Sequence, residues 1–293
     1  MRWESGRESS NVEDRRGAGG FGGLPGGGRG VGIGGIVVAL VAALFFGIDP
    51  GVVLQGMGDG GSPQATAPTQ QAPGGARPAD DPGARFVSVV LASTEDTFTQ
   101  AFREAGVQYR PPTLVLFEGR TPTACGTGSA ASGPFYCPAD QRLYIDLSFF
   151  RVLRERLGAP GDFAQAYVVA HEVGHHVQNL LGTMGQVHSM RGRASEAQNN
   201  ALSVRLELQA DCLAGVWAAR SQQARGWLET GDLDEALRAA AAVGDDTLQK
   251  RSQGTAVPET FTHGTAAQRA GWFRTGFKSG RMESCDTFKA GQR

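Results

Sequence analysis

Residues 168–180, VVAHEVGHHVQNL, limit what this chain can fold into more than any other stretch. They hold three of its five histidines within a segment that has the apolar spacing of a helix. On a helix, His171 and His175 lie on one face with about 6 Å between their Cβ atoms. A helix in a hydrophobic core has no use for two imidazoles and an acid, because unpaired buried polar groups are costly. The spacing therefore predicts that both rings bind one zinc ion.

Glu172 follows His171 directly and completes a His-Glu-x-x-His motif. A carboxylate there can take a proton from a water held at the open position of a zinc ion, which makes Glu172 the candidate general base. The alternative is an exposed helix face that carries these residues by chance, but the flanking apolar residues favour the metal site. Gly174 weakens a helix by about 1 kcal/mol relative to alanine, so another element is expected to approach closely there.

A catalytic zinc ion usually has three protein ligands, so a third is expected outside this helix. Residue 181 is leucine, which excludes a third histidine six positions after His175. His188 lies in a loop-like segment and is interpreted as a surface residue. Glu207 and Asp211 lie four residues apart in the apolar segment RLELQADCLAG, where a buried carboxylate needs a partner. We expect Glu207 to bind the metal and Asp211 to accept a hydrogen bond from an imidazole, the alternative being a solvated helix face.

An uncharged stretch lies near the N-terminus. Residues 30–48, GVGIGGIVVALVAALFFGI, would extend about 28 Å as a helix, close to the thickness of bilayer hydrocarbon. Arginines precede the stretch, and no lysine or arginine follows it until Arg77, which favours a cytoplasmic N-terminus. The prediction is one transmembrane helix with the remaining chain on the periplasmic, extracytoplasmic side of the inner membrane. A cleaved signal peptide is the alternative.

Composition divides the rest of the chain. Residues 1–29 are rich in glycine and are predicted to be a disordered cytoplasmic tail. Residues 49–83 are rich in proline, glycine, alanine and glutamine and are predicted to be a flexible linker. The folded domain is expected over residues 84–289. The formal net charge of −1 and the lack of a basic stripe argue against a nucleic-acid partner.

Hydrophobic periodicity predicts helices and strands in this domain. Helices are expected over residues 85–106, 149–158, 161–182 and 193–226, with two more beginning at Asp232 and Thr265. Strands are expected at residues 112–119 and 142–150. Four predicted helix starts have Gln or Glu three residues after a capping residue: Asp162, Ser195, Asp232 and Thr265. Two strands among several helices indicate an α+β domain dominated by helices.

Taken together, these segments resemble the neutral zinc metallopeptidase family of bacterial membranes, a gluzincin-like group of zincins. The likeness extends over nearly the whole chain and includes MRWESGRESSNVEDRRG, GPFYCPADQRLYIDLSFF, AHEVGHHVQ, ELQADCLAGVWA and FTHGTAAQR. It implies a helix-rich, zincin-like domain with a small sheet. It also implies that residues 142–150 form an edge strand beside the active-site helix, to which a peptide substrate would add. Asp146 would then cap the following helix or point into the cleft.

The resemblance also implies roles for individual residues. The zinc ligands would be His171, His175 and Glu207, with Glu172 as general base and Asp211 as the partner of a ligand histidine. His263 either donates a hydrogen bond to the oxyanion of the reaction or is a structural histidine at a helix start. Arg269 is expected to pair with an acid such as Asp211.

The four cysteines, Cys125, Cys137, Cys212 and Cys285, contain no Cys-x-x-Cys pair, so a thiolate zinc site is not expected. Outside the cytoplasm they could form disulfides. Pairing Cys125 with Cys137, and Cys212 with Cys285, closes the shortest loop first. Free buried thiols are the alternative.

The function predicted from these features is zinc-dependent hydrolysis of a peptide bond by a metalloendopeptidase at the outer face of the inner membrane. One zinc ion would be the cofactor, and a peptide or protein the substrate. Two alternatives stay open: a non-catalytic zinc-binding scaffold of the cell envelope, and a zinc amidase that acts on the cell wall. An intact Glu172 argues against the scaffold, because a structural zinc site does not need that acid.

Overall fold

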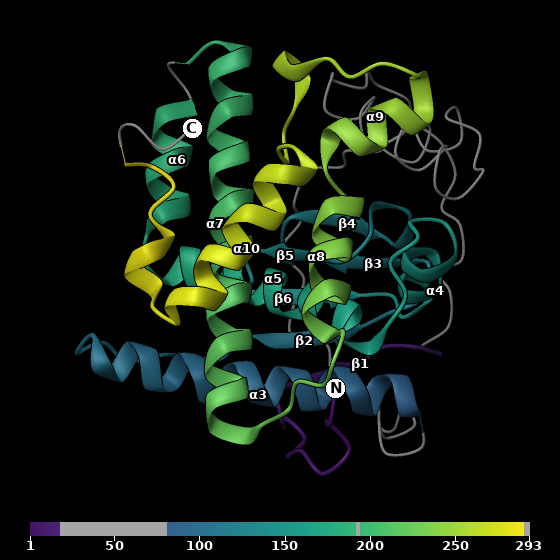
Figure 1. Ribbon diagram of the computed structural model, residues 1–293, viewed down its shortest axis with the longest axis vertical. Coiled ribbons are helices and arrows are strands. Elements are labelled where there is room, and N and C mark those ends of the chain that lie inside the picture. Colours follow the sequence, from purple (N-terminus) through teal and green to yellow (C-terminus); the bar gives the residue numbers. More distant parts are fainter. Residues whose placement is uncertain (18–80, 192–193, 290–293) are drawn as a thin grey trace, which may run out of the picture.

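The computed structural model describes residues 1–17, 81–191 and 194–289. They form a helix-rich α+β domain with a small sheet, as predicted (Figure 1). The predicted membrane-spanning segment, residues 30–48, lies outside the described residues, as does the predicted linker up to residue 80. Among the helices of the described ranges, none combines the length and the apolar character needed to cross a bilayer.

Helix α3 (Pro82–Glu104) lies across the lower part of the domain in Figure 1. Asp81 caps this helix, because its carboxylate accepts hydrogen bonds from the backbone N–H groups of Gly83 and Ala84. Pro82, whose fixed φ suits the first turn of a helix, follows the cap directly. The helix therefore begins three residues earlier than the sequence pattern indicated.

The main sheet has the strand order β1-β2-β6-β5. Strands β1 (Val12–Asp14), β2 (Thr113–Leu116) and β6 (Arg142–Ile145) are parallel, and β5 (Phe135–Cys137) pairs antiparallel with β6. The prediction that residues 142–150 form the edge strand is therefore wrong. β6 lies between β2 and β5, and the edge strands of this sheet are β1 and β5.

The physical reason for this error lies in the length of β5. Three residues after a glycine- and serine-rich loop are too few to show alternation, whereas β6 has the apolar content of a strand covered on both faces. Residues 148–150 belong to helix α4 (Ser148–Glu155) instead of the strand. The loop before β5 also contains a short hairpin of β3 (Arg120–Thr123) and β4 (Gly126–Ser129) that the pattern did not indicate.

Residues 1–17 belong to the folded domain, so the prediction of a disordered tail is wrong for this part of residues 1–29. β1 adds a parallel strand to β2. Trp3 packs edge-on against Phe86 of α3, with ring centroids 5.1 Å apart. A polar segment can be ordered in this way because it completes an existing sheet and core, so it does not have to bury a core of its own.

An ion-pair group joins the two ends of the segment that is not described. Arg16 donates to Asp14 with Nη2 at 2.7 Å, and its Nη1 pairs with the Asp81 carboxylate. Asp81 is the residue that caps α3. Residues 17 and 81, at which the description of the chain stops and resumes, therefore lie close together.

The remaining helices surround the long helix α7 (Glu196–Arg225) and the central helix α5 (Asp162–Leu180). The others are α6 (Thr183–Arg191), α8 (Asp232–Ala242), α9 (Asp245–Gln253) and α10 (Ala266–Ser279). Short 3-10 turns occur at Ala130–Ser132, Pro258–Thr260 and Met282–Cys285. Helix α6 occupies the segment around His188 that was predicted to be loop-like, and His188 is exposed on it.

Two of the four predicted helix caps are confirmed. Ser195 and Thr265 each form a capping box at the starts of α7 and α10. The prediction is wrong for Asp162 and Asp232, because glycines occupy those cap positions. Both aspartates instead form ion pairs with the amine of Met1, at 2.9 Å and 3.3 Å. An aspartate followed three residues later by Gln or Glu can therefore belong to an ion-pair cluster as well as to a helix cap. The local sequence pattern does not distinguish the two.

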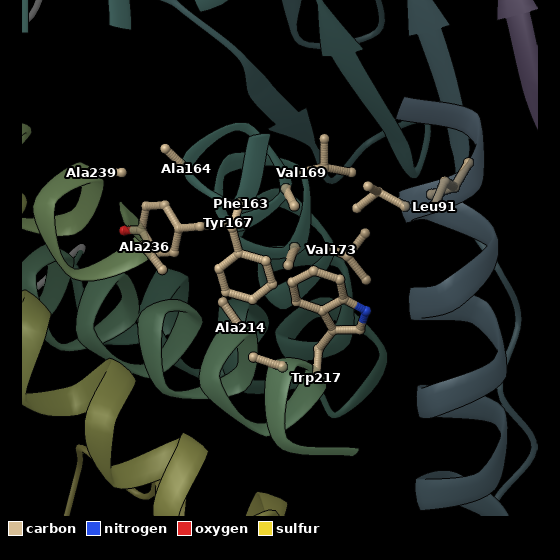
Figure 2. Packing of buried hydrophobic residues seen from close by; sticks show 14 of the residues in the cluster. Leu91, Phe163, Ala164, Tyr167, Val169, Val173, Ala214, Trp217, Ala236 and Ala239 are labelled. Atoms are coloured by element: carbon tan, nitrogen blue, oxygen red, sulfur yellow. The ribbon is translucent and has the colours of Figure 1, made fainter. Parts of the chain in front are cut away.

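The core lies between α5, α7, α8 and α3 (Figure 2). Phe163 of α5 stacks on Trp217 of α7, with ring centroids 5.7 Å apart and an interplanar angle of 13°. Trp217 is fully buried, and its indole N–H donates to Ser93 of α3. Each such side chain stabilises the fold by roughly 1.5–3 kcal/mol, which fixes α5 and α7 relative to each other.

Helix α10 crosses α7 at glycines. A Cβ atom at Gly276 would lie 1.8 Å from the Cys212 carbonyl oxygen, and one at Gly215 would lie 2.1 Å from the Phe273 carbonyl oxygen. The two backbones are therefore in direct contact, which only glycine permits. This contact brings Arg269 of α10 onto the face of α7 that carries Asp211.

Candidate metal centre

Helices α5 and α7 bring the three predicted ligands together. His171 Nε2 lies 3.2 Å from Glu207 Oε2, and His175 Nε2 lies 3.4 Å from Glu207 Oε1. One donor atom from each of these residues lies within 4.8 Å of the other two. Two imidazole nitrogens and a carboxylate oxygen are the donor set of a catalytic zinc ion with three protein ligands, so these residues fit that metal.

Gly174 permits this convergence. A Cβ atom at this position would lie 2.9 Å from the carbonyl oxygen and 3.0 Å from the Cα atom of Ala210 on α7. The expectation that another element approaches closely at Gly174 is therefore confirmed. The approach occurs between His171 and His175, the two candidate ligands of α5, and within one turn of Glu207 on α7.

Asp211 orients His171, as predicted. His171 Nδ1–H donates to Asp211 Oδ1 at 2.9 Å, which leaves Nε2 to face Glu207. The Asp211 carboxylate also accepts from Arg269 Nε at 2.8 Å, from Arg269 Nη2 at 3.0 Å and from the Tyr167 hydroxyl at 2.5 Å. Arg269 thus supplies the charge that a fully buried aspartate requires.

The two acids of α7 remain ionised despite their environment. Burial alone would raise the pKa of Asp211, but Arg269 and His171 lower it below its usual value. Burial likewise acts to raise the pKa of Glu207, and His175 and His171 bring it well below the usual range. An ionised Glu207 is the form that can bind a cation.

Glu172 differs from these two acids. Its side chain is buried next to His171, and burial raises its pKa above the ordinary value, although the two histidines partly oppose this shift. A carboxyl group with a raised pKa binds a proton more readily than an ordinary glutamate, which favours a role in proton transfer. Glu172 therefore remains the candidate general base.

A cavity of about 550 Å³ opens over these residues. Its polar lining includes His171, Glu172, His175, Glu207, His263 and Arg269. Apolar side chains line other parts of it, among them Phe149, Val152, Val168, Met184, Leu206 and Leu248. Phe135 and Tyr136 of the edge strand β5 also border the cavity, so a strand edge and the candidate metal ligands line the same cavity.

His263 lies in this cavity and has a carboxylate behind it. Its Nδ1 is 3.2 Å from Asp245 Oδ1, and Asp245 Oδ2 accepts hydrogen bonds from three backbone N–H groups, those of Thr262, His263 and Gly264. Partial burial acts to lower the pKa of His263, but Asp245 and the nearby Glu207 raise it above the usual value. Asp245 could not be recognised from the sequence, because no local motif links it to a histidine 18 residues later.

The other candidate residues have structural contacts. Asp146 accepts hydrogen bonds from the backbone N–H groups of Gly119 and Ser148. It lies one residue before the N-cap position of α4, which Leu147 occupies without a side-chain cap. His176 is buried, donates from Nε2 to the Arg110 carbonyl oxygen at 2.7 Å, and contacts the Tyr136 hydroxyl with Nδ1 at 3.1 Å. His176 thus joins α5 to the edge strand, and it is not part of the ligand group.

Both predicted disulfides are present. Cys125 is bonded to Cys137, and Cys212 is bonded to Cys285. The first holds the end of the edge strand β5 to the hairpin beside it. The second joins α7, immediately after Asp211, to the C-terminal 3-10 turn.

The sequence model of the family described as "Putative neutral zinc metallopeptidase" matches residues 1–288. The chain belongs to this family. Family membership implies zinc as the metal, and the group of His171, His175 and Glu207 offers suitable donors for it.

Similar proteins occur in Escherichia coli and Mycobacterium tuberculosis. The YpfJ protein of Escherichia coli (strain K12) is 50% identical over 295 residues, which cover 98% of this chain and 99% of that protein. The Rv2575 protein of Mycobacterium tuberculosis (strain H37Rv) is 44% identical over 216 residues, covering 70% of this chain and 72% of that protein. The names of these relatives state no activity. No solved structure matches the chain.

Proposed function

We propose that this protein is a zinc-dependent endopeptidase that hydrolyses peptide bonds in the cavity that opens over His171, His175 and Glu207. The observation that carries the proposal is the convergence of His171, His175 and Glu207 within 4.8 Å, with the buried carboxyl group of Glu172 beside them. Membership in a family of zinc metallopeptidases supports it.

Zinc bound by these three residues would polarise a carbonyl group and lower the pKa of a water molecule at its open position. Glu172 accepts the proton of the attacking water and then delivers it to the leaving amine. The pKa of Glu172, raised by burial, suits both steps. His263, with Asp245 behind it, donates a hydrogen bond to the carbonyl oxygen as negative charge develops there.

The edge strand β5 offers a binding mode for an extended peptide. It pairs with β6 on one side, and its residues Phe135 and Tyr136 border the cavity. A substrate strand that adds to the free edge would make main-chain hydrogen bonds independent of its sequence. This role belongs to β5 in place of residues 142–150.

The test of the proposed function is a comparison of purified protein with the Glu172→Gln and His171→Ala variants. We expect one zinc ion per chain in the wild type and in Glu172→Gln, and loss of zinc from His171→Ala, measured by elemental analysis. Cleavage of casein should fall by roughly 10²- to 10⁴-fold in Glu172→Gln, since the proton acceptor is removed while the ligands remain.

Three results would contradict the proposal. Unchanged zinc content in His171→Ala would show that the zinc ion is not bound at the proposed site. Equal inertness of wild type and Glu172→Gln with zinc bound would favour a non-catalytic scaffold. Cleavage of peptidoglycan fragments in preference to peptides would favour an amidase.

We further propose that the domain works outside the cytoplasm. Two disulfides support an oxidising compartment, because reducing systems keep cysteines free in the cytosol. The contacts of residues 1–17 with the rest of the domain support a revised arrangement of the chain. In this arrangement residues 1–17 lie on the same side of the membrane as residues 81–289.

A further inference from the structure

Gln178 lies almost one turn after His175 on α5 and is completely buried, with 0% of its surface exposed. Its amide oxygen, Oε1, lies 2.9 Å from His175 Nδ1. Its amide nitrogen, Nε2, donates to the Leu206 carbonyl oxygen at 2.7 Å and to Gln209 Oε1 at 3.1 Å, both on α7. One side chain thus contacts a candidate ligand on α5 and the backbone next to another, Glu207, on α7.

These contacts fix the direction of the amide and the tautomer of the histidine. Two acceptors on α7 require the NH₂ group of Gln178, so its oxygen must face His175. An amide oxygen can only accept a hydrogen bond, so His175 carries its proton on Nδ1. Its Nε2 is then the nitrogen with a free lone pair, and this atom faces Glu207 at 3.4 Å.

We propose that Gln178 is the positioning residue of His175 and holds the ring in the tautomer and orientation that a metal ion requires. This inference rests on the proposed zinc site. Asp211 does the same for His171, but with a charge that Arg269 neutralises. A neutral amide behind His175 orients the second ring without another buried anion, which would need its own counterion.

The test is the zinc affinity of the full chain with Gln178→Met, which keeps the length and volume of the side chain but removes both polar atoms. We expect the affinity for Zn²⁺, measured by competition with a chelator, to fall about 10- to 100-fold. Asn179→Ala is the matched control. Asn179 is the next residue on α5, and its amide donates to the Tyr136 hydroxyl instead of contacting a ligand. This control should bind zinc like the wild type.

A spectroscopic measurement separates positioning from a general effect on packing. In ¹H–¹⁵N spectra of the zinc-loaded wild type, His175 should show a protected Nδ1–H proton, and Gln178→Met should lose that protection while remaining folded. If Gln178→Met fails to fold, the wild-type spectrum alone still tests the tautomer of His175. A proton on Nε2 of His175 would overturn the inference. Equal zinc affinity in the wild type and Gln178→Met would also overturn it. Failure of the wild type to bind zinc at all would instead overturn the proposed function.

Discussion

At the scale of single residues, the pair of His263 and Asp245 determines how catalysis should depend on pH. The pKa of His263 is raised, so its imidazole stays protonated above the usual range and loses its proton as the pH rises through the raised value. If the protonated ring stabilises the oxyanion, activity should decline on the alkaline side with that pKa.

Asp245→Asn removes the charge behind the ring but keeps an oxygen to accept the backbone hydrogen bonds. We therefore expect the pKa of His263 to fall and the alkaline decline of kcat/KM to move to lower pH. His263→Gln should lower kcat/KM by about 10²- to 10³-fold and abolish that part of the profile. A pH profile of Asp245→Asn that coincides with the wild type would show that His263 has a structural role only.

The sequence was sufficient to predict those site residues that lie near each other along a helix. His171 with His175, and Glu207 with Asp211, are each four residues apart, so helical geometry alone places each pair on one face. Asp245 and Gln178 could not be predicted as parts of the site. Asp245 approaches His263 through a turn of the fold, and Gln178 looks like any polar residue until α7 is packed against it.

At the scale of elements, the distance between α5 and α7 controls the metal site. Gly174→Ala would place a methyl group 2.9 Å from the Ala210 carbonyl oxygen, so one helix must move. We expect zinc affinity to fall at least tenfold, because Glu207 would be displaced from both histidines. Overpacking costs about 1–3 kcal/mol, which the better helix propensity of alanine offsets by only about 1 kcal/mol.

Gly185→Ala provides the control for that experiment. Gly185 lies in α6, and a Cβ atom there would have no atom within 4 Å. This substitution should leave zinc affinity unchanged, as measured by chelator competition. Unaltered zinc binding by Gly174→Ala would mean that the contact between the two helices does not set the ligand positions.

The long elements were easier to predict than the short ones. Helices α3, α5 and α7 have many periods of apolar spacing, and their existence was correctly predicted with errors of a few residues at the ends. Strands β1 and β5 have three residues each, and they are strands because they pair with β2 and β6, respectively. A local pattern contains no information about these partners.

At the scale of the whole molecule, residues 1–17 and 81–289 form one body, so they should occupy one compartment. A cysteine at exposed Ser10 and a cysteine at exposed Arg274 should then react alike with a membrane-impermeant maleimide in cells with a permeabilised outer membrane. Reaction of Arg274→Cys alone, with Ser10→Cys labelled only after the inner membrane is disrupted, would place the two parts on opposite sides.

The ion pairs of Arg16 with Asp14 and Asp81 have one further consequence, for the engineering of this protein. Because these ion pairs hold residues 16 and 81 close together, a linker of a few glycines and serines should be able to replace residues 18–80. The replacement should leave Arg16 and Asp81 in place. Each halving of the closed loop favours folding by about 0.6 kcal/mol. The shortened protein should therefore unfold at a slightly higher urea concentration than the full-length chain. It also offers a compact form for crystallisation.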